Sequence, residues 1–398
     1  MGISEARRYV DGAERRARLA VRHGLAGSAR AGSPEEVAEA LVALHGSDPA
    51  TVYLAIGARL ADPADTVVET DRALYEDRSL VRMHGMRHTV FVFPTALTAV
   101  VHASTGLDVA GRERAALVKD MAKAGAPDAV WLKEVEESTL AALDRLGQAT
   151  AAELAREEPR LREQFVYAAG KSYEGVHTVS TRLLRLLGTE GKVVRGRPLG
   201  SWTSSRFRWA PAPEHPELDA AETQAELLRR WLAVCGPATE ADLKWWTGWR
   251  VTDVRRALRA SGAREVTVDE GTAYVVAGDE EAVTTGPAEP WAALLPALDP
   301  TAMGWRERDW YLAPESRGAL FDRSGNVGPT VWWDGRVVGG WAQRADGEVV
   351  WRLLEDVGRE AEAAIGRAAE RLRGWVGATR VRPRFPTPLD KELSAAGG

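Results

Sequence analysis

A short polar stretch between two predicted helices carries three side chains whose chemistry suits catalysis. His45, Ser47 and Asp48 supply an imidazole, a hydroxyl and a carboxylate within four positions. Asp48 followed by Pro49 is typical of a helix N-cap and the first helical residue. Because free backbone N–H groups point outward at a helix start, this corner concentrates polar groups. The alternative is that Ser47 and Asp48 only cap the helix and that His45 fills a gap.

The composition bounds the kind of protein that this chain forms. Its 398 residues are 45% hydrophobic and 27% charged, which is ordinary for a globular protein with two or three domains. A single cysteine, Cys235, excludes an intramolecular disulfide framework and a multi-cysteine zinc site, and it fits a reducing cytoplasm. No signal peptide and no apolar run of about 18 residues is present, so we expect a cytoplasmic, nucleoid-associated protein without a membrane span.

Apolar periodicity predicts that most of the N-terminal half is helical. The predicted helices are 1–30, 34–44, 49–61, 66–76, 95–104, 111–124 and 128–145. Residues 79–94 change to a strand period, with Gly85 at the turn of a hairpin. His84 and His88 lie on this hairpin, but strand geometry separates them and no third ligand is in view. We therefore predict no metal site and no cofactor.

A turn sequence occurs twice in the same context. Gly147 to Leu154 and Gly236 to Leu243 share their Gly, Ala, Thr, Ala, acidic and Leu positions. Each lies between two predicted helices, and paired strands follow: Arg264 to Asp269 and Thr272 to Ala277 in the second case. Helix, turn, helix and hairpin is the order of a winged helix, so the repeat predicts tandem winged helices.

The last hundred residues change to strands and turns. Asp334-Gly335 between apolar runs is a strong hairpin signal, and a helix is predicted from Val357 to Trp375. We predict a small β-barrel or sheet here, and an α+β fold for the whole chain. The predicted domains are 1–128, 129–210, 218–285 and 290–398, with a proline-rich linker over 211–216.

A basic segment follows the first copy of the repeated turn. Between positions 182 and 208 the only acidic residue is Glu190, against seven basic ones: Arg182, Arg185, Lys192, Arg195, Arg197, Arg206 and Arg208. A basic wing beside a recognition helix is the pattern expected for contacts with DNA phosphates. The alternative is an ordinary solvated surface. Trp245, Trp246 and Trp249 have helical spacing, which favours core packing over base stacking.

Four motifs resemble those of the AlkZ/YcaQ-like winged-helix proteins. They are Cys235 to Gly248, Leu294 to Pro300, Gly325 to Pro329 and Asp334 to Gly339. The resemblance covers about residues 15–385. It implies three winged helices and a β-barrel, arranged as a C around a DNA channel. It also implies a DNA glycosylase that removes bulky N-alkylated purines and unhooks crosslinks, in some members as self-resistance to a DNA-alkylating natural product.

The resemblance also places the candidate catalytic motif at the polar corner. The family motif is Gln–hydrophobic–Gln or a variant with an acid or a histidine. Tyr53 and Arg59 fit the family register, which puts His45 and Ser47 at the two motif positions, where this chain has neither glutamine. We predict that His45, Ser47 and Asp48 are catalytic, and that Arg59 and Arg87 join the basic segment in binding DNA.

Two further functions fit the same sequence. One is a non-catalytic winged-helix protein that regulates or binds lesions. The other is a small-molecule enzyme or a drug-sequestering protein with a closed apolar pocket. The partner expected of a glycosylase is double-stranded, alkylated DNA, bound by a monomer without membrane contact. One feature separates the glycosylase from the non-catalytic DNA-binding protein. In a glycosylase His45 and Asp48 converge on an open channel, whereas in a non-catalytic protein capping uses these side chains.

Overall fold

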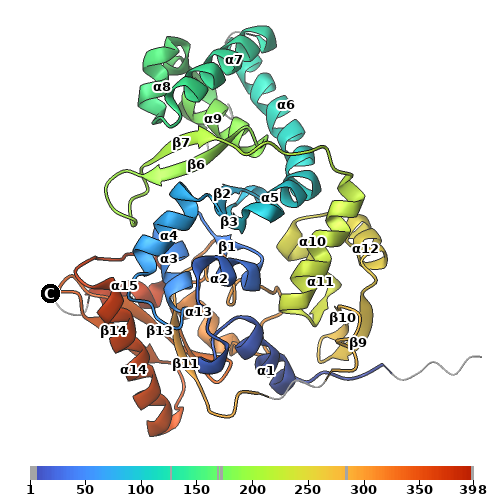
Figure 1. Ribbon diagram of the computed structural model, residues 1–398, viewed down its shortest axis with the longest axis vertical. Coiled ribbons are helices and arrows are strands. Elements are labelled where there is room, and N and C mark those ends of the chain that lie inside the picture. The colour runs from blue at the N-terminus through green and yellow to red at the C-terminus, as the bar shows by residue number, and fades with distance from the viewer. Residues whose placement is uncertain (1–6, 126–127, 168–169, 171–173, 283–285, 396–398) are drawn as a thin grey trace, which may run out of the picture.

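The computed structural model describes residues 7–125, 128–167, 170, 174–282 and 286–395 (Figure 1). It is a mixed α/β protein built from short helices and several small antiparallel sheets. The helices are α1 Gly12–Arg22, α2 Pro34–Leu41, α3 Pro49–Gly57, α4 Thr66–Asp71, α5 Thr95–Val101, α6 Leu107–Lys123, α7 Ala129–Leu146, α8 Ala151–Glu157, α9 Val179–Thr189, α10 Ala220–Cys235, α11 Glu240–Thr247, α12 Val251–Ala260, α13 Arg317–Leu320, α14 Gly358–Val376 and α15 Pro388–Ala395.

Most strands pair as hairpins. They are β1 Leu44–His45, β2 Leu80–His84, β3 Val90–Pro94, β4 Gln164–Tyr167, β5 Gly175–Thr178, β6 Val193–Pro198, β7 Phe207–Pro211, β8 Ala238–Thr239, β9 Arg264–Val268, β10 Gly271–Val275, β11 Ala292–Leu295, β12 Thr330–Trp333, β13 Arg336–Gln343 and β14 Val349–Leu353. The predicted hairpin at 264–277 is observed as β9 and β10. The observed helix α1 is shorter than the helix predicted over 1–30. In residues 7–30 the structure has α1 and one 3₁₀ turn, and residues 1–6 lie outside the described chain.

One order of elements occurs three times. Each copy has a helix, a one- or two-residue strand, a capped helix and a hairpin whose second strand pairs with the short strand. In the first copy β1 pairs with β3, in the second Ala149 pairs with Trp209 of β7, and in the third β8 pairs with β10. The two copies of the repeated turn therefore occupy equivalent places.

Both repeated turns form a capping box. Thr150 accepts from the backbone N–H of Glu153, whose carboxylate accepts in return from the Thr150 backbone N–H, and Thr239 and Asp242 do the same. Asp242 is fully buried, and its other oxygen accepts from the backbone N–H groups of Arg306 and Glu307. This carboxylate therefore ties the third copy to the C-terminal part of the chain.

The first copy departs from the other two at one place. In the second and third copies, the short strand leads directly into the helix cap. In the first copy, Gly46 and Ser47 are inserted between the strand residue His45 and the cap Asp48. A side chain at Gly46 would meet the backbone of Val90 and Phe91 at 3.2 Å, so the inserted turn lies tight against β3.

The C-terminal strands form an open sheet, which corrects the β-barrel expectation. Its order is β11-β12-β13-β14, and no described strand joins β11 to β14. Helix α14 packs against β11, β12 and β14, and α15 packs against β13. Because helices cover the sheet, it buries its apolar residues without closing on itself.

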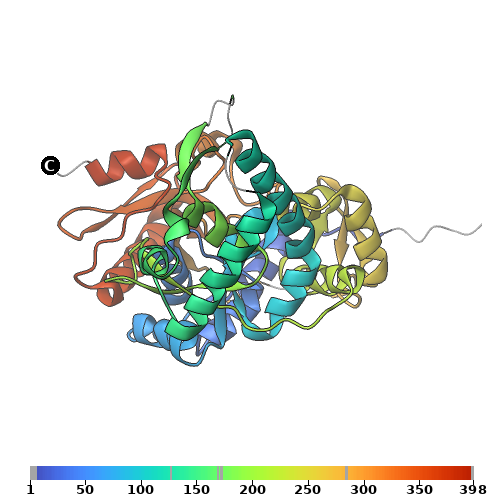
Figure 2. The same cartoon turned by 90° about the horizontal axis from the view of Figure 1, so that it is seen from above.

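The hydrophobic cores join the first and third copies to the C-terminal sheet and leave the second copy with a core of its own. One core combines α1, the β2–β3 hairpin, α10–α12 and the sheet, and includes Trp246 and Trp249, which confirms their predicted packing role. The separate core lies among α6–α9. Figure 2 shows this helical part lying over the rest of the molecule, with the C-terminal sheet to one side and α10–α12 to the other. Strands β6 and β2 meet between them.

No helix within the described residues is long and apolar enough to cross a membrane.

The two capping boxes predict different losses of stability. Thr150→Ala removes one cap and should lower the free energy of unfolding by about 1 kcal/mol. Asp242→Ala leaves three backbone N–H groups without their acceptor and should cost at least about 3 kcal/mol. Urea titration of both variants measures this difference. Equal small losses would show that Asp242 does not stabilise the contact between the third copy and the C-terminal part of the chain.

Candidate functional site

The corner between β1 and α3 is held by two arginines from distant parts of the chain. Arg82 on β2 is buried, and its Nε and Nη2 both donate to the carbonyl oxygen of Gly46. Arg384, in the segment before α15, donates from Nη1 to the carbonyl oxygen of Ser47 at 3.1 Å. Both inserted residues are therefore fixed through their backbone, because guanidinium groups bind their carbonyls.

His45 is a buried, neutral imidazole. It packs edge-on against Phe91, with the ring centroids 5.2 Å apart, and its Nδ1 faces the backbone N–H of Ser47 at 3.4 Å. Burial, with the nearby charges of Arg87 and Arg82, lowers its pKa to about 3. The ring is therefore uncharged at neutral pH and is a weak base.

Asp48 is the N-cap of α3 and uses both carboxylate oxygens in backbone hydrogen bonds. Oδ1 accepts from the N–H of Ala50 at 3.2 Å, and Oδ2 accepts from the N–H of Arg384 at 2.9 Å. Burial raises its pKa, although the two N–H donors and the nearby arginines oppose this shift. The capping alternative is thus realised for Asp48, and among the described residues no hydrogen bond joins its carboxylate to His45.

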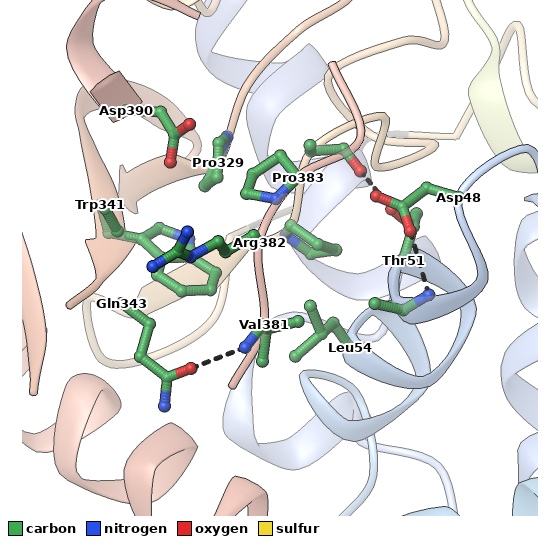
Figure 3. Close-up of a pocket in the computed structure, with 14 residues that line it drawn as sticks. Asp48, Thr51, Leu54, Pro329, Trp341, Gln343, Val381, Arg382, Pro383 and Asp390 are labelled. Carbon is green, nitrogen blue, oxygen red and sulfur yellow. Dashed lines mark hydrogen bonds between the residues drawn. The ribbon is translucent and has the colours of Figure 1, made fainter. Parts of the chain in front are cut away.

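The carboxylate of Asp48 also borders a pocket against the C-terminal segment. The pocket is lined by Thr51, Leu54, Trp341, Arg382 and Asp390 among others. Figure 3 shows Arg382 and Pro383 between Asp48 and Asp390. Burial raises the pKa of Asp390 to about 6. Ser47, in contrast, is half-buried, so its hydroxyl lies at the accessible edge of the corner.

Four arginines around the corner have no carboxylate within ion-pair distance among the described residues. They are Arg82, Arg87, Arg195 and Arg384. Arg87 stacks on Trp245 and Arg195 stacks on Phe207. Burial and the charges of Arg82, Arg384 and Arg185 lower the pKa of Arg195 to about 9. Such mutual repulsion is relieved by an anion, so this arginine cluster is the best-placed anion site near the corner.

Arg82 and Arg384 were not predicted from the sequence. Arg82 carries a signal that could have found it, because a charged residue stands inside the apolar strand Leu80–His84 and must have a buried partner. Arg384 has no such signal, since its place depends on how the C-terminal segment folds back.

The structure corrects the prediction that Arg59 contacts DNA. Its guanidinium is fully buried and makes two hydrogen bonds to Asp299, at 2.7 and 2.9 Å. It also donates to the carbonyl oxygens of His23 and Ala55 and to Thr301. Every side of the group is occupied, so Arg59 joins the end of α1, α3 and the segment between β11 and β12.

The basic segment at 182–208 is less free than its sequence indicates, because acidic residues from other elements pair with it. Lys192 pairs with Glu136 and Glu190, Arg197 with Asp71 and Glu76, Arg208 with Glu153, and Arg185 with Glu113 at 3.8 Å. Glu190 is the only acidic residue within the segment, but most of the carboxylates that pair with it come from other elements.

Three members of the segment keep an accessible or unpaired charge. Arg206 is exposed, Arg182 stacks on Tyr167, and Arg195 belongs to the arginine cluster. The structure thus brings Arg87 and Arg195 to the corner. The charge of Arg185 also acts on Arg195, and Arg182 and Arg206 are not part of the arginine cluster. Among the described residues, no three His, Cys, Asp or Glu side chains lie close enough to hold a metal ion together.

A corner fixed by guanidinium groups and surrounded by arginines without a carboxylate partner is suited in charge to an anionic ligand. The model of the DNA glycosylase AlkZ-like family matches residues 38–375. The chain therefore belongs to the AlkZ-like DNA glycosylase family, as the motifs predicted.

Two known proteins support this placement. An interstrand DNA cross-link repair glycosylase of Streptomyces sahachiroi is 31% identical over 186 residues, which is 44% of this chain and 48% of that protein, so the match spans about half of the relative's length. The solved structure of the DNA glycosylase AlkZ of Streptomyces sahachiroi is 21% identical, with a TM-score of 0.71 over 94% of this chain and 99% of that one. At this identity the structural match shows a shared fold.

The buried place of Arg59 predicts a loss of stability on substitution. Arg59→Met leaves Asp299 charged and unpaired in the interior, so the free energy of unfolding should fall by about 3–5 kcal/mol. The exposed Arg206→Met is the matched control and should leave stability unchanged. A stable Arg59→Met protein with weakened DNA binding would restore the original assignment.

The buried histidines predict acid sensitivity. His23 and His45 each have a pKa of about 3 in the folded chain and about 6.5 when unfolded, so their stability contribution is complete above 6.5 and is lost as the pH falls. Between pH 7 and pH 5 each should lower the free energy of unfolding by about 2 kcal/mol. His45→Gln should reduce that drop by about this amount in urea titrations at the two pH values; an unchanged drop would mean that His45 titrates normally.

Proposed function

We propose that this protein is a DNA glycosylase that hydrolyses the N-glycosidic bond of bulky N-alkylated purines. The observation that carries the proposal is the polar corner His45–Asp48, which the sequence resemblance predicts to be the catalytic motif and which arginines without a carboxylate partner surround. Phosphates flanking a lesion would bind Arg87, Arg195 and Arg384, because these guanidinium groups have no carboxylate partner.

Hydrolysis of this bond requires few catalytic groups at the corner. An N7-alkylated purine is already a cationic leaving group, so its departure needs no general acid. The enzyme must place a water below C1′ and stabilise an oxocarbenium-like sugar. The neutral His45 ring is suited to orient that water and not to remove its proton fully, given its low pKa. Asp48 supplies negative charge near the sugar, and the hydroxyl of Ser47 orients either partner.

The repeated order of elements supports an arrangement of three winged helices. The order is a helix, a short strand, a capped helix and a two-stranded hairpin that pairs with the short strand. It occurs in residues 34–94, 129–211 and 220–275. We propose that these units correspond to the predicted domains 1–128, 129–210 and 218–285, and that with residues 290–398 they enclose a DNA channel. The arginine cluster would then lie on the wall of that channel.

The substrate class follows the curated relative. That protein is described as an interstrand DNA cross-link repair glycosylase, and we propose that this chain also unhooks crosslinked or bulky purine adducts. Bulky adducts suit an open corner, since full extrusion of such a base costs more than for a small lesion. A role in self-resistance to a DNA-alkylating natural product, carried out by a monomer on double-stranded DNA, completes the proposal.

The capping of Asp48 favours a second candidate function. Both carboxylate oxygens already accept backbone hydrogen bonds, and Nδ1 of His45 faces a backbone N–H. A non-catalytic protein that binds alkylated DNA would need the arginine cluster and not these side chains. Base release is the measurement that separates the two functions.

Base excision should depend on the corner. With duplex DNA containing N7-alkylguanine, the protein should release the base and leave abasic sites. Asp48→Asn and His45→Ala should each lower this rate by about 10²-fold or more, because each removes a group that positions water or stabilises charge.

A cap remote from the corner provides the control. Asp219 caps α10 through the N–H groups of Ala221 and Glu222, so Asp219→Asn repeats the same chemical change elsewhere and should leave excision unchanged. No base release by the wild-type protein from any alkylated duplex would favour the non-catalytic function. Normal excision by both corner variants would place the active groups elsewhere.

DNA binding should depend more on unpaired than on paired arginines. Arg195→Ala should weaken duplex binding regardless of sequence and should reduce its salt dependence, because a phosphate contact is lost. Arg208 already pairs with Glu153, so Arg208→Ala is the matched control and should weaken DNA binding less. Equal losses measured by fluorescence anisotropy would show that the ion pairs do not decide which arginines meet DNA.

A further inference from the structure

An open groove is lined by residues 25–30, residues 287–292 and helix α14. Helix α14 lies at the end of the molecule away from α6–α9 (Figure 1). The volume of the groove is about 510 Å³, within the usual range for ligand sites. The residues that matter to its chemistry are Leu25, Arg30, Glu289, Trp291, Arg367 and Arg371. None of them belongs to the corner or to the arginine cluster around it.

The groove carries positive charge that the described residues do not pair. Arg30, Arg367 and Arg371 make no ion pair there, and one acidic residue, Glu289, lines the groove with them. Arg371 donates instead to the carbonyl oxygens of Leu60 and Ala61, at 2.6 and 2.9 Å. Nε of Arg30 is buried without a hydrogen-bond partner.

The concave setting distinguishes these three arginines more than their lack of ion pairs does, because nearly half of the arginines in the described chain form no ion pair. On α14 itself, Arg373 pairs with Glu370, on the side of the helix away from the groove lining. Burial and the charge of Arg371 also lower the pKa of Arg30. Unpaired cations that repel one another in a concave site are stabilised by a bound anion.

The groove continues into an apolar extension. A second, smaller pocket shares Arg30, Arg371, Ala292 and Ala368 with it and is lined further on by Leu294, Leu372 and Trp375. This extension holds only about 30 Å³, so the organic body of a ligand with an anionic group at the arginines would lie in the groove itself. Planar guanidinium forks match the oxygen atoms of phosphate groups, which they bind with two hydrogen bonds each.

We propose that this groove binds phosphate groups, as carried by a free nucleotide or by the backbone of a nucleic acid outside the catalytic corner. Arg367 and Arg371 supply the charge from α14, and Arg30 closes the site from the opposite side. The proposal is independent of base excision, because none of its residues contacts His45, Ser47 or Asp48.

Calorimetric titration of the full chain with tripolyphosphate tests the site. Arg367→Glu should weaken binding at one site by about tenfold or more, since an attractive charge becomes repulsive. Arg367 is exposed and makes no hydrogen bond or ion pair with the part of the chain that the structure describes, so this change should leave the fold intact. Arg373→Glu makes the same change of charge on the same helix, outside the groove, and should match the wild type.

Two results would overturn the site: no saturable binding to the wild-type protein, or equal weakening by both variants. Hydrogen exchange then locates the bound tripolyphosphate, and protection of residues 27–31 and 364–371 is expected.

A titration repeated with saturating unmodified duplex identifies the source of the phosphate groups. Displacement of tripolyphosphate from the groove indicates a nucleic-acid backbone, and retention indicates a nucleotide-like ligand. At saturating duplex, the excision rate of Arg367→Glu should equal that of the wild type whichever ligand the groove takes, so failure of this site and failure of the proposed function are distinguishable.

Discussion

Helix α3 is held at both ends by buried charged groups, and the relation between the N-terminal and C-terminal parts depends on this. Every residue from Pro49 to Gly57 is buried. Asp48 at its start accepts from the backbone of Arg384, and Arg59 just after its end binds Asp299. Because unpaired charges in the interior cost several kcal/mol, both pairings must be satisfied together in the folded chain. The corner that precedes α3 is consequently fixed in position by the whole fold.

The distribution of ion pairs decides where the molecule can receive an anion. Arginines are frequent along the chain, but about half of them have a carboxylate partner that a phosphate would have to replace. At the corner and in the groove beside α14, guanidinium groups without such partners gather in one place. Whether each arginine has a carboxylate partner therefore predicts an anion site better than the number of basic residues in a segment does.

Local signals predicted much of the fold. The Gly-x-Ala-Thr turn predicted two equivalent capped helices, and Asp48-Pro49 predicted the start of α3, because capping depends on residues three or four positions apart. The family resemblance was likewise predicted from motifs and is confirmed.

Contacts between distant residues were beyond such signals. Arg59 and Asp299 are 240 positions apart, and the carboxylates that pair with the basic segment come from α7, α8 and the helical turns before β2. The helices that keep the C-terminal sheet open also come from later in the chain. The corner itself was predicted from its residue types, but its two anchoring arginines depend on tertiary packing.

The central claim is that the corner beside the arginine cluster receives DNA. A crystal structure of the protein bound to a duplex with a stable abasic-site analogue tests it most directly. The account predicts phosphate oxygens within hydrogen-bond distance of Arg195 and Arg384, with the deoxyribose facing His45 and Ser47. A duplex bound elsewhere, with Arg195 and Arg384 still free of phosphate and the corner empty, would contradict it.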